Sequence, residues 1–275
     1  MKERLLAREL ANGGSGDFSI SALGSGSDYT PFIQYAGIAS LNIGFGGENG
    51  GGEYHTIYDT YTHFKRFKDP DMAYGLALAR VAGRLSLRLA NAEVLPFTFG
   101  PWEKTVSGYL EEVISTADTM RKESESRKAL IAKNAFGLAA DPTKPRAKPA
   151  EEADIPYLDF SPLQNALAGL AGAVKILESK DPQSLPPDKK AQLNRLLMEA
   201  EHQLTDQAGL PRRPWYKHQI YAPGFYTGYG VKTLPGVREA IEQKNWEEAQ
   251  AQIGRLAGTL SKMTDHLKKM NQLFQ

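Results

Sequence analysis

The sequence predicts a chain of two parts, a short α/β part followed by a longer all-helical part. Residues 38–45 are rich in β-branched and aromatic side chains and alternate towards their end, as a strand does. After Trp102 such strand signals almost vanish, and prolines and a glycine gather at Pro96 and at Gly100-Pro101. Because proline and glycine punctuate secondary structure, this cluster predicts the boundary between the two parts.

Helix and strand signals alternate within the first part. Residues 1–10 have the leucine spacing of the end of a helix, and residues 29–36 are apolar-rich before the predicted strand. A further helix is predicted from Asp69-Pro70, an N-cap followed by a proline that suits the first helical turn, to about Asn91. Its predicted buried stripe consists of Met72, Leu76, Ala79, Gly83, Leu87 and Ala90. This wiring is typical of an open, mostly parallel sheet covered by helices.

The second part shows apolar side chains at helical spacing in five stretches. They are residues 102–138, 162–180 and 189–206, a short helix after Pro235, and residues 246–274. Residues 141–156 are rich in proline and charge and cannot continue a helix. Residues 209–233 form a long irregular segment with the aromatic side chains Trp215, Tyr216, Tyr221, Phe225, Tyr226 and Tyr229. A loop of this size usually has a function or belongs to an interface.

The composition narrows the function classes. The 33 lysines and arginines against 32 aspartates and glutamates leave a net charge of +1, so no overall field favours nucleic acid or an anionic membrane. The chain has no cysteine, which excludes disulfides, thiol catalysis and a cysteine-type zinc site but leaves the compartment open. No window reads as a signal peptide or a membrane span, so we expect a cytoplasmic protein or a targeting segment upstream of Met1.

The stretch from Glu53 to Tyr61 carries the most distinctive chemistry. On a helix, His55, Asp59 and His63 would share one face and could ligate a metal. The threonines, the isoleucine and the tyrosines around them argue against a helix there. A lone histidine beside tyrosines is most often a hydrogen-bonded structural residue, so the residues alone leave both interpretations open.

Two glycine-rich segments do not match established motifs. The run from Gly44 to Gly52 lacks the Lys-Ser/Thr of a phosphate-binding loop and does not fit the dinucleotide fingerprint. Residues 24–28, Gly-Ser-Gly-Ser-Asp, lack the strand-turn-helix context of a nucleophilic serine. We expect the glycine run to be a mobile loop beside a cleft, and we expect no serine nucleophile.

Several short motifs follow one another along the chain in the order in which a known family has them. They are Leu-Gly-Ser-Gly-Ser-Asp-Tyr at 23–29, Gly-Ile-Ala-Ser at 37–40, Tyr-His-Thr-Ile-Tyr-Asp-Thr-Tyr at 54–61, Leu-Ala-Asn at 89–91, Val-Leu-Pro-Phe at 94–97, Gly-Leu-Pro at 209–211, Arg-Pro-Trp-Tyr at 213–216, Ile-Tyr-Ala-Pro at 220–223 and Leu-Pro-Gly at 234–236. With these motifs the chain resembles the carboxy-terminal part of the glutamate carboxypeptidase II branch of the M28 zinc peptidases. The resemblance implies that residues 1–98 are the end of an αβα peptidase domain. Residues 99–275 would then be a helical dimerisation domain like that of the transferrin receptor.

The resemblance also implies a site. Family members bind two zinc ions, which activate a water and polarise the scissile carbonyl. The position of His55 is a zinc ligand there, and Tyr54 beside it lines the pocket for the carboxylate end of the substrate. Tyr229 matches a tyrosine that the helical domain contributes to the same pocket. A loop near the metals corresponds to Ser25, Gly26 and Ser27.

Most of the catalytic machinery of that family has no counterpart here. The other zinc ligands and the glutamate general base are missing between Met1 and His55. We therefore expect no catalytic residue in this chain, an incomplete zinc site, and no activity of the chain alone. The complete protein would be a zinc-dependent exopeptidase that acts on peptides.

Two departures from the family's pattern bear on the substrate. Glutamate-selective members have a lysine where this chain has Gly228, and an arginine patch where Asn42 and Gly44 stand. A glutamate side chain would lose charge-assisted partners, so we expect a broader exopeptidase.

The family further implies a homodimer through the helical part, whose alanine-rich helices permit close packing, and export to a periplasm or the cell exterior. A rival hypothesis is a non-catalytic receptor or scaffold of the transferrin-receptor type, which shares the fold but has lost the metal ligands. The presence of His55 favours the peptidase lineage. A third hypothesis is an autonomous helical binding module.

Overall fold

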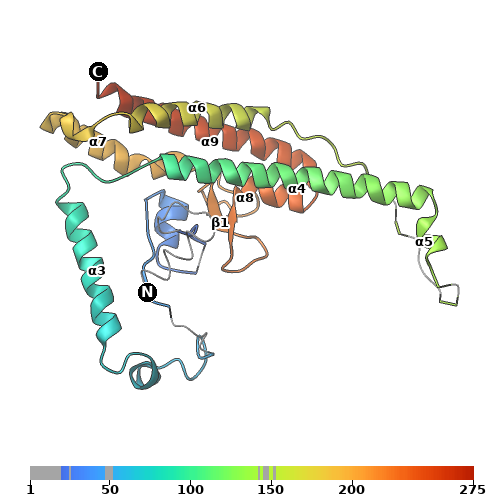
Figure 1. The fold of residues 1–275 in the computed structure, drawn as a ribbon, viewed down its shortest axis with the longest axis horizontal. Helices are drawn as coiled ribbons and strands as arrows, with labels where there is room; N and C mark the ends of the chain where they lie inside the picture. The colour runs from blue at the N-terminus through green and yellow to red at the C-terminus, as the bar shows by residue number, and fades with distance from the viewer. Residues whose placement is uncertain (1–19, 25, 47–51, 142, 145–148, 151–152) are drawn as a thin grey trace.

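The computed structural model describes residues 20–24, 26–46, 52–141, 143–144, 149–150 and 153–275. Three long helices, α4 (Gly100–Ala132), α6 (Ser161–Glu178) and α9 (Trp246–Gln272), lie side by side (Figure 1). The shorter elements of this half are α5 (Ala135–Leu138), η3 (Pro182–Ser184), α7 (Pro187–Glu199), η4 (Glu201–Leu204) and α8 (Pro235–Glu242). The second part is therefore mostly helical, as predicted, although it also contains a two-stranded sheet formed by residues 221–223 and 231–233.

The core lies where α4, α6, α8 and α9 meet. Apolar side chains recur every three or four residues along these helices, so each helix presents one continuous stripe to its neighbours. The stripe of α4 is Val106, Leu110, Val113 and Ala117; that of α6 is Leu163, Leu167, Leu170 and Val174; that of α9 is Ile253, Leu256, Leu260, Met263, Leu267 and Met270. Proline stands in the first turn of α4, α6 and α7, where its missing N–H costs no hydrogen bond.

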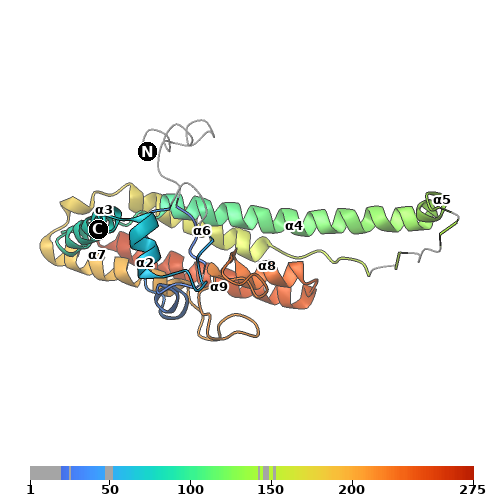
Figure 2. The same cartoon turned by 90° about the horizontal axis from the view of Figure 1, so that it is seen from below.

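The outer half of α4 extends beyond α6 and α9 and leads to α5 (Figure 2). The chain returns along it, because the Arg121 guanidinium lies over the Tyr157 ring at 3.8 Å and Lys128 forms an ion pair with Asp154. Within the described ranges, no helix is both long and apolar enough to cross a bilayer.

The strand predicted at residues 38–45 is wrong, because the described residues of that run are irregular. The first half instead contains η1 (Pro31–Ala36), α2 (Tyr61–His63), η2 (Phe64–Lys68) and α3 (Ala73–Ala90). An extended run becomes a strand only when a neighbour satisfies its N–H and C=O groups, and no described residue of the first half offers such a neighbour. The αβα part therefore stays a prediction.

Helix α3 ends at the predicted residue, since Asn91 is its C-cap. It begins later than predicted, yet the Asp69 carboxylate still accepts hydrogen bonds from the N–H groups of Tyr74 (3.2 Å) and Gly75 (2.8 Å). Its predicted buried stripe is wrong: no residue of α3 is buried, and Leu76 and Leu87 are 53% and 65% exposed. The helix stands apart from the bundle (Figure 1), so nothing in the described chain covers its apolar face.

Candidate functional site

The aromatic segment predicted as irregular contains a small hairpin. Strands β1 (Tyr221–Pro223) and β2 (Val231–Thr233) pair antiparallel, with Tyr221 opposite Thr233. The loop between them, residues 224–230, is closed by its own hydrogen bonds: Gly224 N–H donates to Gly230 O (2.9 Å), and Gly230 N–H donates to Thr227 O (3.0 Å). The loop therefore holds Tyr229 in a defined place.

Gly24 and Gly26, which come about 200 residues earlier in the sequence, lie directly against Tyr229. A Cβ on Gly26 would lie 2.4 Å from Cδ1 of Tyr229, and one on Gly24 would lie 2.5 Å from the Tyr229 carbonyl oxygen. Gly26 also has a φ of +74°, which only glycine adopts without strain. Two of the predicted substrate-binding residues, Gly26 and Tyr229, are thus in contact.

Gln34 anchors this early segment to the helical half. It is buried, its side-chain amide donates to Gly24 O, and its backbone carbonyl accepts from the N–H groups of Lys217 (2.8 Å) and His218 (3.1 Å). His218 is itself buried, with Nδ1 accepting from two backbone N–H groups and Nε2 2.9 Å from the Glu201 carboxylate. The Nδ1 bonds place the ring proton on Nε2, so every polar atom of the imidazole is used for structure.

A pocket of about 450 Å³ opens at this junction. Its lining includes Gly26, Thr30, Arg213, Tyr216, Phe225 and Tyr229. Gly228 lines it as well. The pocket is therefore lined by two segments that are far apart in the sequence, and two of its lining residues, Gly26 and Tyr229, are ones that the family resemblance marks as substrate-binding.

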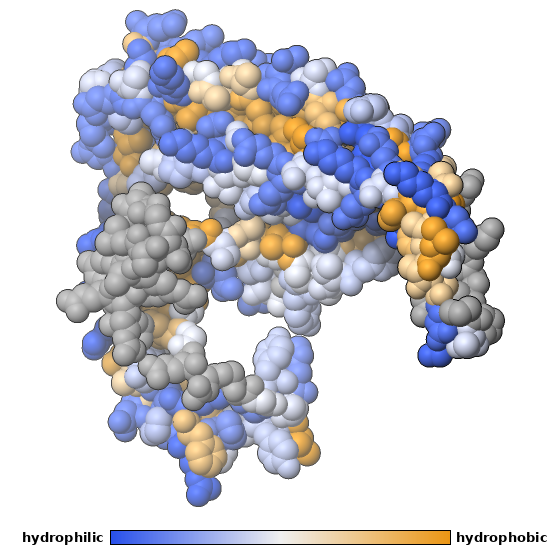
Figure 3. Space-filling view, turned by 45° about the vertical axis from the view of Figure 1, so that its right-hand side comes forward, coloured by the Kyte–Doolittle hydropathy of each residue, from blue (hydrophilic) through white to orange (hydrophobic). Residues whose placement is uncertain are grey.

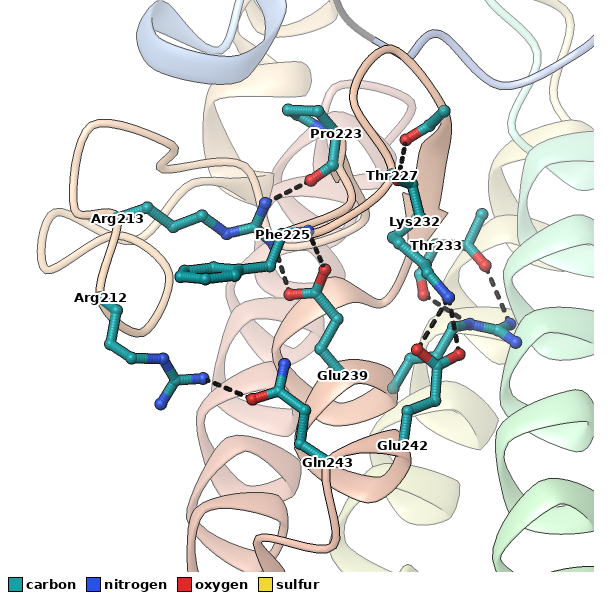
Figure 4. A network of polar contacts seen from close by, with 12 residues as sticks. Arg212, Arg213, Pro223, Phe225, Thr227, Lys232, Thr233, Glu239, Glu242 and Gln243 are labelled. Atoms are coloured by element: carbon teal, nitrogen blue, oxygen red, sulfur yellow. Dashed lines mark hydrogen bonds and ion pairs between the residues drawn. The ribbon is translucent and has the colours of Figure 1, made fainter.

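The lining residue Arg213 forms an ion pair with Glu239, which lies behind the pocket wall. Glu239 of α8 accepts from Arg213 through one carboxylate oxygen and from the Phe225 N–H, at 2.6 Å, through the other (Figure 4). Arg213 also donates to Pro223 O. Burial lowers the pKa of the Arg213 guanidinium, and Glu239 opposes that shift. The pair fixes both ends of the segment from Pro223 to Phe225, where the loop begins.

The His55 stretch is built differently. Tyr54 stacks on the His55 ring at 3.8 Å between centroids, and both side chains are exposed. His55 has a φ of +58°, a backbone conformation uncommon outside glycine, and its N–H donates to Asp59 Oδ2 at 3.3 Å. Neither Tyr54 nor His55 is among the described residues that line the pocket.

The described side chains fit a zinc ion only in part. An exposed imidazole such as His55 is a suitable ligand, but a zinc site takes three or four. Among the residues that the structure describes, no group of three histidines, aspartates and glutamates converges to hold a metal. His63 instead packs against the Phe67 ring, and its N–H donates to Thr60. A zinc ion at His55 would therefore need further ligands that the described residues do not supply.

Of the two remaining predicted site residues, the structure describes Ser27 but not Ser25. Ser25 lies outside the described residues. Ser27 is exposed, and its backbone carbonyl accepts from Thr30 N–H at 3.0 Å. The roles assigned to Tyr54, His55, Ser25, Gly26, Ser27 and Tyr229 stay predictions.

Comparison with known proteins adds independent information. Residues 158–268 match the transferrin receptor-like dimerisation domain family. A probable glutamate carboxypeptidase of Arabidopsis thaliana is 32% identical over 85% of the chain, and one of Arthroderma benhamiae is 30% identical over 88%. The chain corresponds to a carboxy-terminal part of the glutamate carboxypeptidase-like peptidases.

The chain covers 30% and 29% of the length of these two relatives. A further relative, an inactive zinc metalloprotease of Schizosaccharomyces pombe, is 25% identical over 88% of the chain and 28% of its own length. The family thus includes proteins named as peptidases and at least one named as inactive.

Sequence reasoning missed Arg213 and Glu239 as partners. Arg213 stood in a recognised motif and the aromatic segment stood out for its length, but nothing in the sequence connects either to position 239. Only α8, which presents Glu239 to the loop, reveals the pair.

Proposed function

We propose that this chain is the carboxy-terminal portion of a zinc-dependent exopeptidase and contributes three things to it. It supplies one zinc ligand, His55. It supplies one wall of the pocket for the carboxylate end of a peptide, through Ser25, Gly26, Ser27 and Tyr229, and Tyr54, which does not line the described pocket, would join that wall in the complete protein. It supplies the homodimer interface through residues 99–275. The contact between Gly26 and Tyr229 is the observation that supports this proposal best, since it joins two positions that the family resemblance assigns to one pocket.

In this proposal the metal and the side chains have separate roles. When bound, zinc would supply a nucleophilic water and a Lewis acid. The imidazole of His55 would bind the metal, and the ring of Tyr229, held by its loop and by Gly26, would fix the end of the peptide. The described residues provide no set of metal ligands for the complete reaction, so we expect the chain by itself to be inactive.

A non-catalytic receptor or scaffold is the second candidate. It is supported by the match to the transferrin receptor-like dimerisation domain and by the relative named as an inactive zinc metalloprotease. In that case His55 would bind no metal.

Expression of the complete protein separates the two candidates. We expect bound zinc and release of carboxy-terminal residues from peptides, both reduced at least tenfold by His55→Ala because a lost first ligand weakens the metal site. His63→Ala, eight residues further along the chain, is the matched control and should keep both the zinc content and the hydrolysis. A protein in which His55→Ala changes neither zinc content nor hydrolysis contradicts the proposal.

Light scattering on the purified chain tests the dimer. One chain has a mass of 30.2 kDa, and we expect a particle of twice that mass. A strictly monomeric species at high micromolar concentration would contradict the proposed interface.

A further inference from the structure

The pocket beside Tyr229 carries almost no net charge. Of the described residues that line it, Arg213 alone bears a charge. The Arg213 and Glu239 side chains form an ion pair in which they are only 11% and 9% exposed. Both carboxylate oxygens of Glu239 are engaged, and Arg213 also donates to Pro223 O. The guanidinium is therefore balanced from behind before any ligand arrives.

Two cations close to the loop are balanced in the same way. Arg212 forms a two-point ion pair with Glu248 of α9, at 2.6 and 3.0 Å. Lys232 of β2 donates to both oxygens of Glu242 of α8, at 2.7 and 2.8 Å (Figure 4). Each of these three positive charges already has a carboxylate partner, so none is left unpaired for an acidic side chain.

Aromatic rings and glycines supply most of the remaining lining. Three aromatic residues, Tyr216, Phe225 and Tyr229, line a space of about 450 Å³. Gly228 contributes no side chain, and a Cβ built on it would meet no heavy atom within 4 Å. The space is therefore large enough for a bulky side chain and is bounded mainly by apolar surface.

We propose that this pocket selects peptides whose terminal side chain is uncharged, and that it prefers an aromatic or large apolar side chain to glutamate or aspartate. The inference rests on the proposed function, in which the pocket receives the end of a peptide, and adds the class of side chain. An ionised side chain would lose water without gaining an unpaired cation. A ring would instead bury apolar area against three other rings.

Binding to the 275-residue chain tests this directly. The chain is titrated with N-acetyl-L-phenylalanine and with N-acetyl-L-glutamate, and the backbone amide signals of Gly26, Gly228 and Tyr229 are followed by NMR. The two probes share an acetyl group and an α-carboxylate and differ only in the side chain. We expect the phenylalanine derivative to bind about tenfold more tightly, the usual scale of discrimination by an apolar pocket. Equal or tighter binding of the glutamate derivative, or no change at these amides with either probe, overturns the proposal.

Gly228→Lys tests the electrostatic reason. The variant adds a cation at the pocket wall and should shift the ratio of the two dissociation constants towards glutamate by about tenfold. Gly228→Gln is the matched control, because its side chain is polar but uncharged and meets the same backbone strain at a φ of +58°. It should leave the ratio near that of the wild type. A lysine variant that binds both probes as the wild type does would overturn the proposal.

Failure of this inference can be told apart from failure of the proposed function. Zinc content and hydrolysis depend on His55, whereas the ratio of the two probes depends on the pocket. A complete enzyme that binds zinc through His55 but best releases terminal glutamate would overturn the side-chain preference alone.

Discussion

Asp206 ties the turn before the aromatic segment to α9. Its Oδ1 accepts from Ala208 N–H at 2.9 Å, and its Oδ2 lies 2.8 Å from Arg255 Nη2. Partial burial raises the pKa of this carboxyl, but the Ala208 hydrogen bond and Arg255 outweigh it and hold the pKa below its ordinary value. The ionised carboxylate is therefore the form that the fold stabilises.

The stability of the chain should depend on Asp206 in a pH-dependent way. Because its pKa is lower in the folded state, its contribution is present above the unfolded pKa of about 3.9 and is lost as the pH falls through the folded value. Asp206→Asn should lower the free energy of unfolding by about 1–2 kcal/mol at pH 7. The gap to wild type should close below about pH 4. Urea midpoints measured from pH 7 to pH 3 give the comparison, and a gap that does not change with pH would contradict this account.

Helices α6 and α9 make the most extensive contact in the bundle, and α4 packs on α6. Leu170, in the middle of α6, is fully buried, whereas Ile176 on the same helix is 53% exposed. The two positions separate helix propensity from packing, since both substitutions to alanine leave a good helix former.

Leu170→Ala should lower the free energy of unfolding by about 2–5 kcal/mol, because it removes buried methyl groups and leaves a cavity. Ile176→Ala should change it by less than about 1 kcal/mol. Equilibrium denaturation of both variants is the measurement. Similar losses at the two positions would mean that α6 is not packed as described.

At the scale of the molecule, the two halves differ in how completely their apolar side chains are buried. The helical half has a continuous core, while the limb from about Tyr54 to Ala90 exposes many large apolar side chains, among them Ile57, Tyr58, Tyr61, Tyr74, Leu76 and Leu87. Figure 3 shows hydrophobic surface on the helical half and on the limb below it. The core of the described chain therefore does not depend on the limb.

Replacing Leu76 and Leu87 together by serine should leave the unfolding midpoint of the helical half nearly unchanged, within about 0.5 kcal/mol, as for most exposed positions. Thermal unfolding followed by circular dichroism at the helical band tests this, with Leu170→Ala as the positive control. A loss as large as that of Leu170→Ala would show that α3 packs on the bundle after all.

The sequence by itself determined the helical half, because helices are local: apolar spacing, prolines in first turns and capping side chains act within a few residues. The predicted helices in 102–138, 162–180, 189–206 and 246–274 are found with modest shifts of their ends, the third ending in the 3₁₀ turn η4. The ordered motifs also identified the family that the comparisons show.

Only the tertiary structure decided the rest, because those features need groups distant in sequence. A strand at 38–45 and a buried face on α3 require neighbours that the described chain does not supply, so local pattern alone misjudged both. The contact of Gly26 with Tyr229 and the ion pair of Arg213 with Glu239 are equally invisible to spacing rules. The pocket exists because the fold brings Gly26, Arg213 and Tyr229 together, and its charge is set by the Glu239 carboxylate on α8.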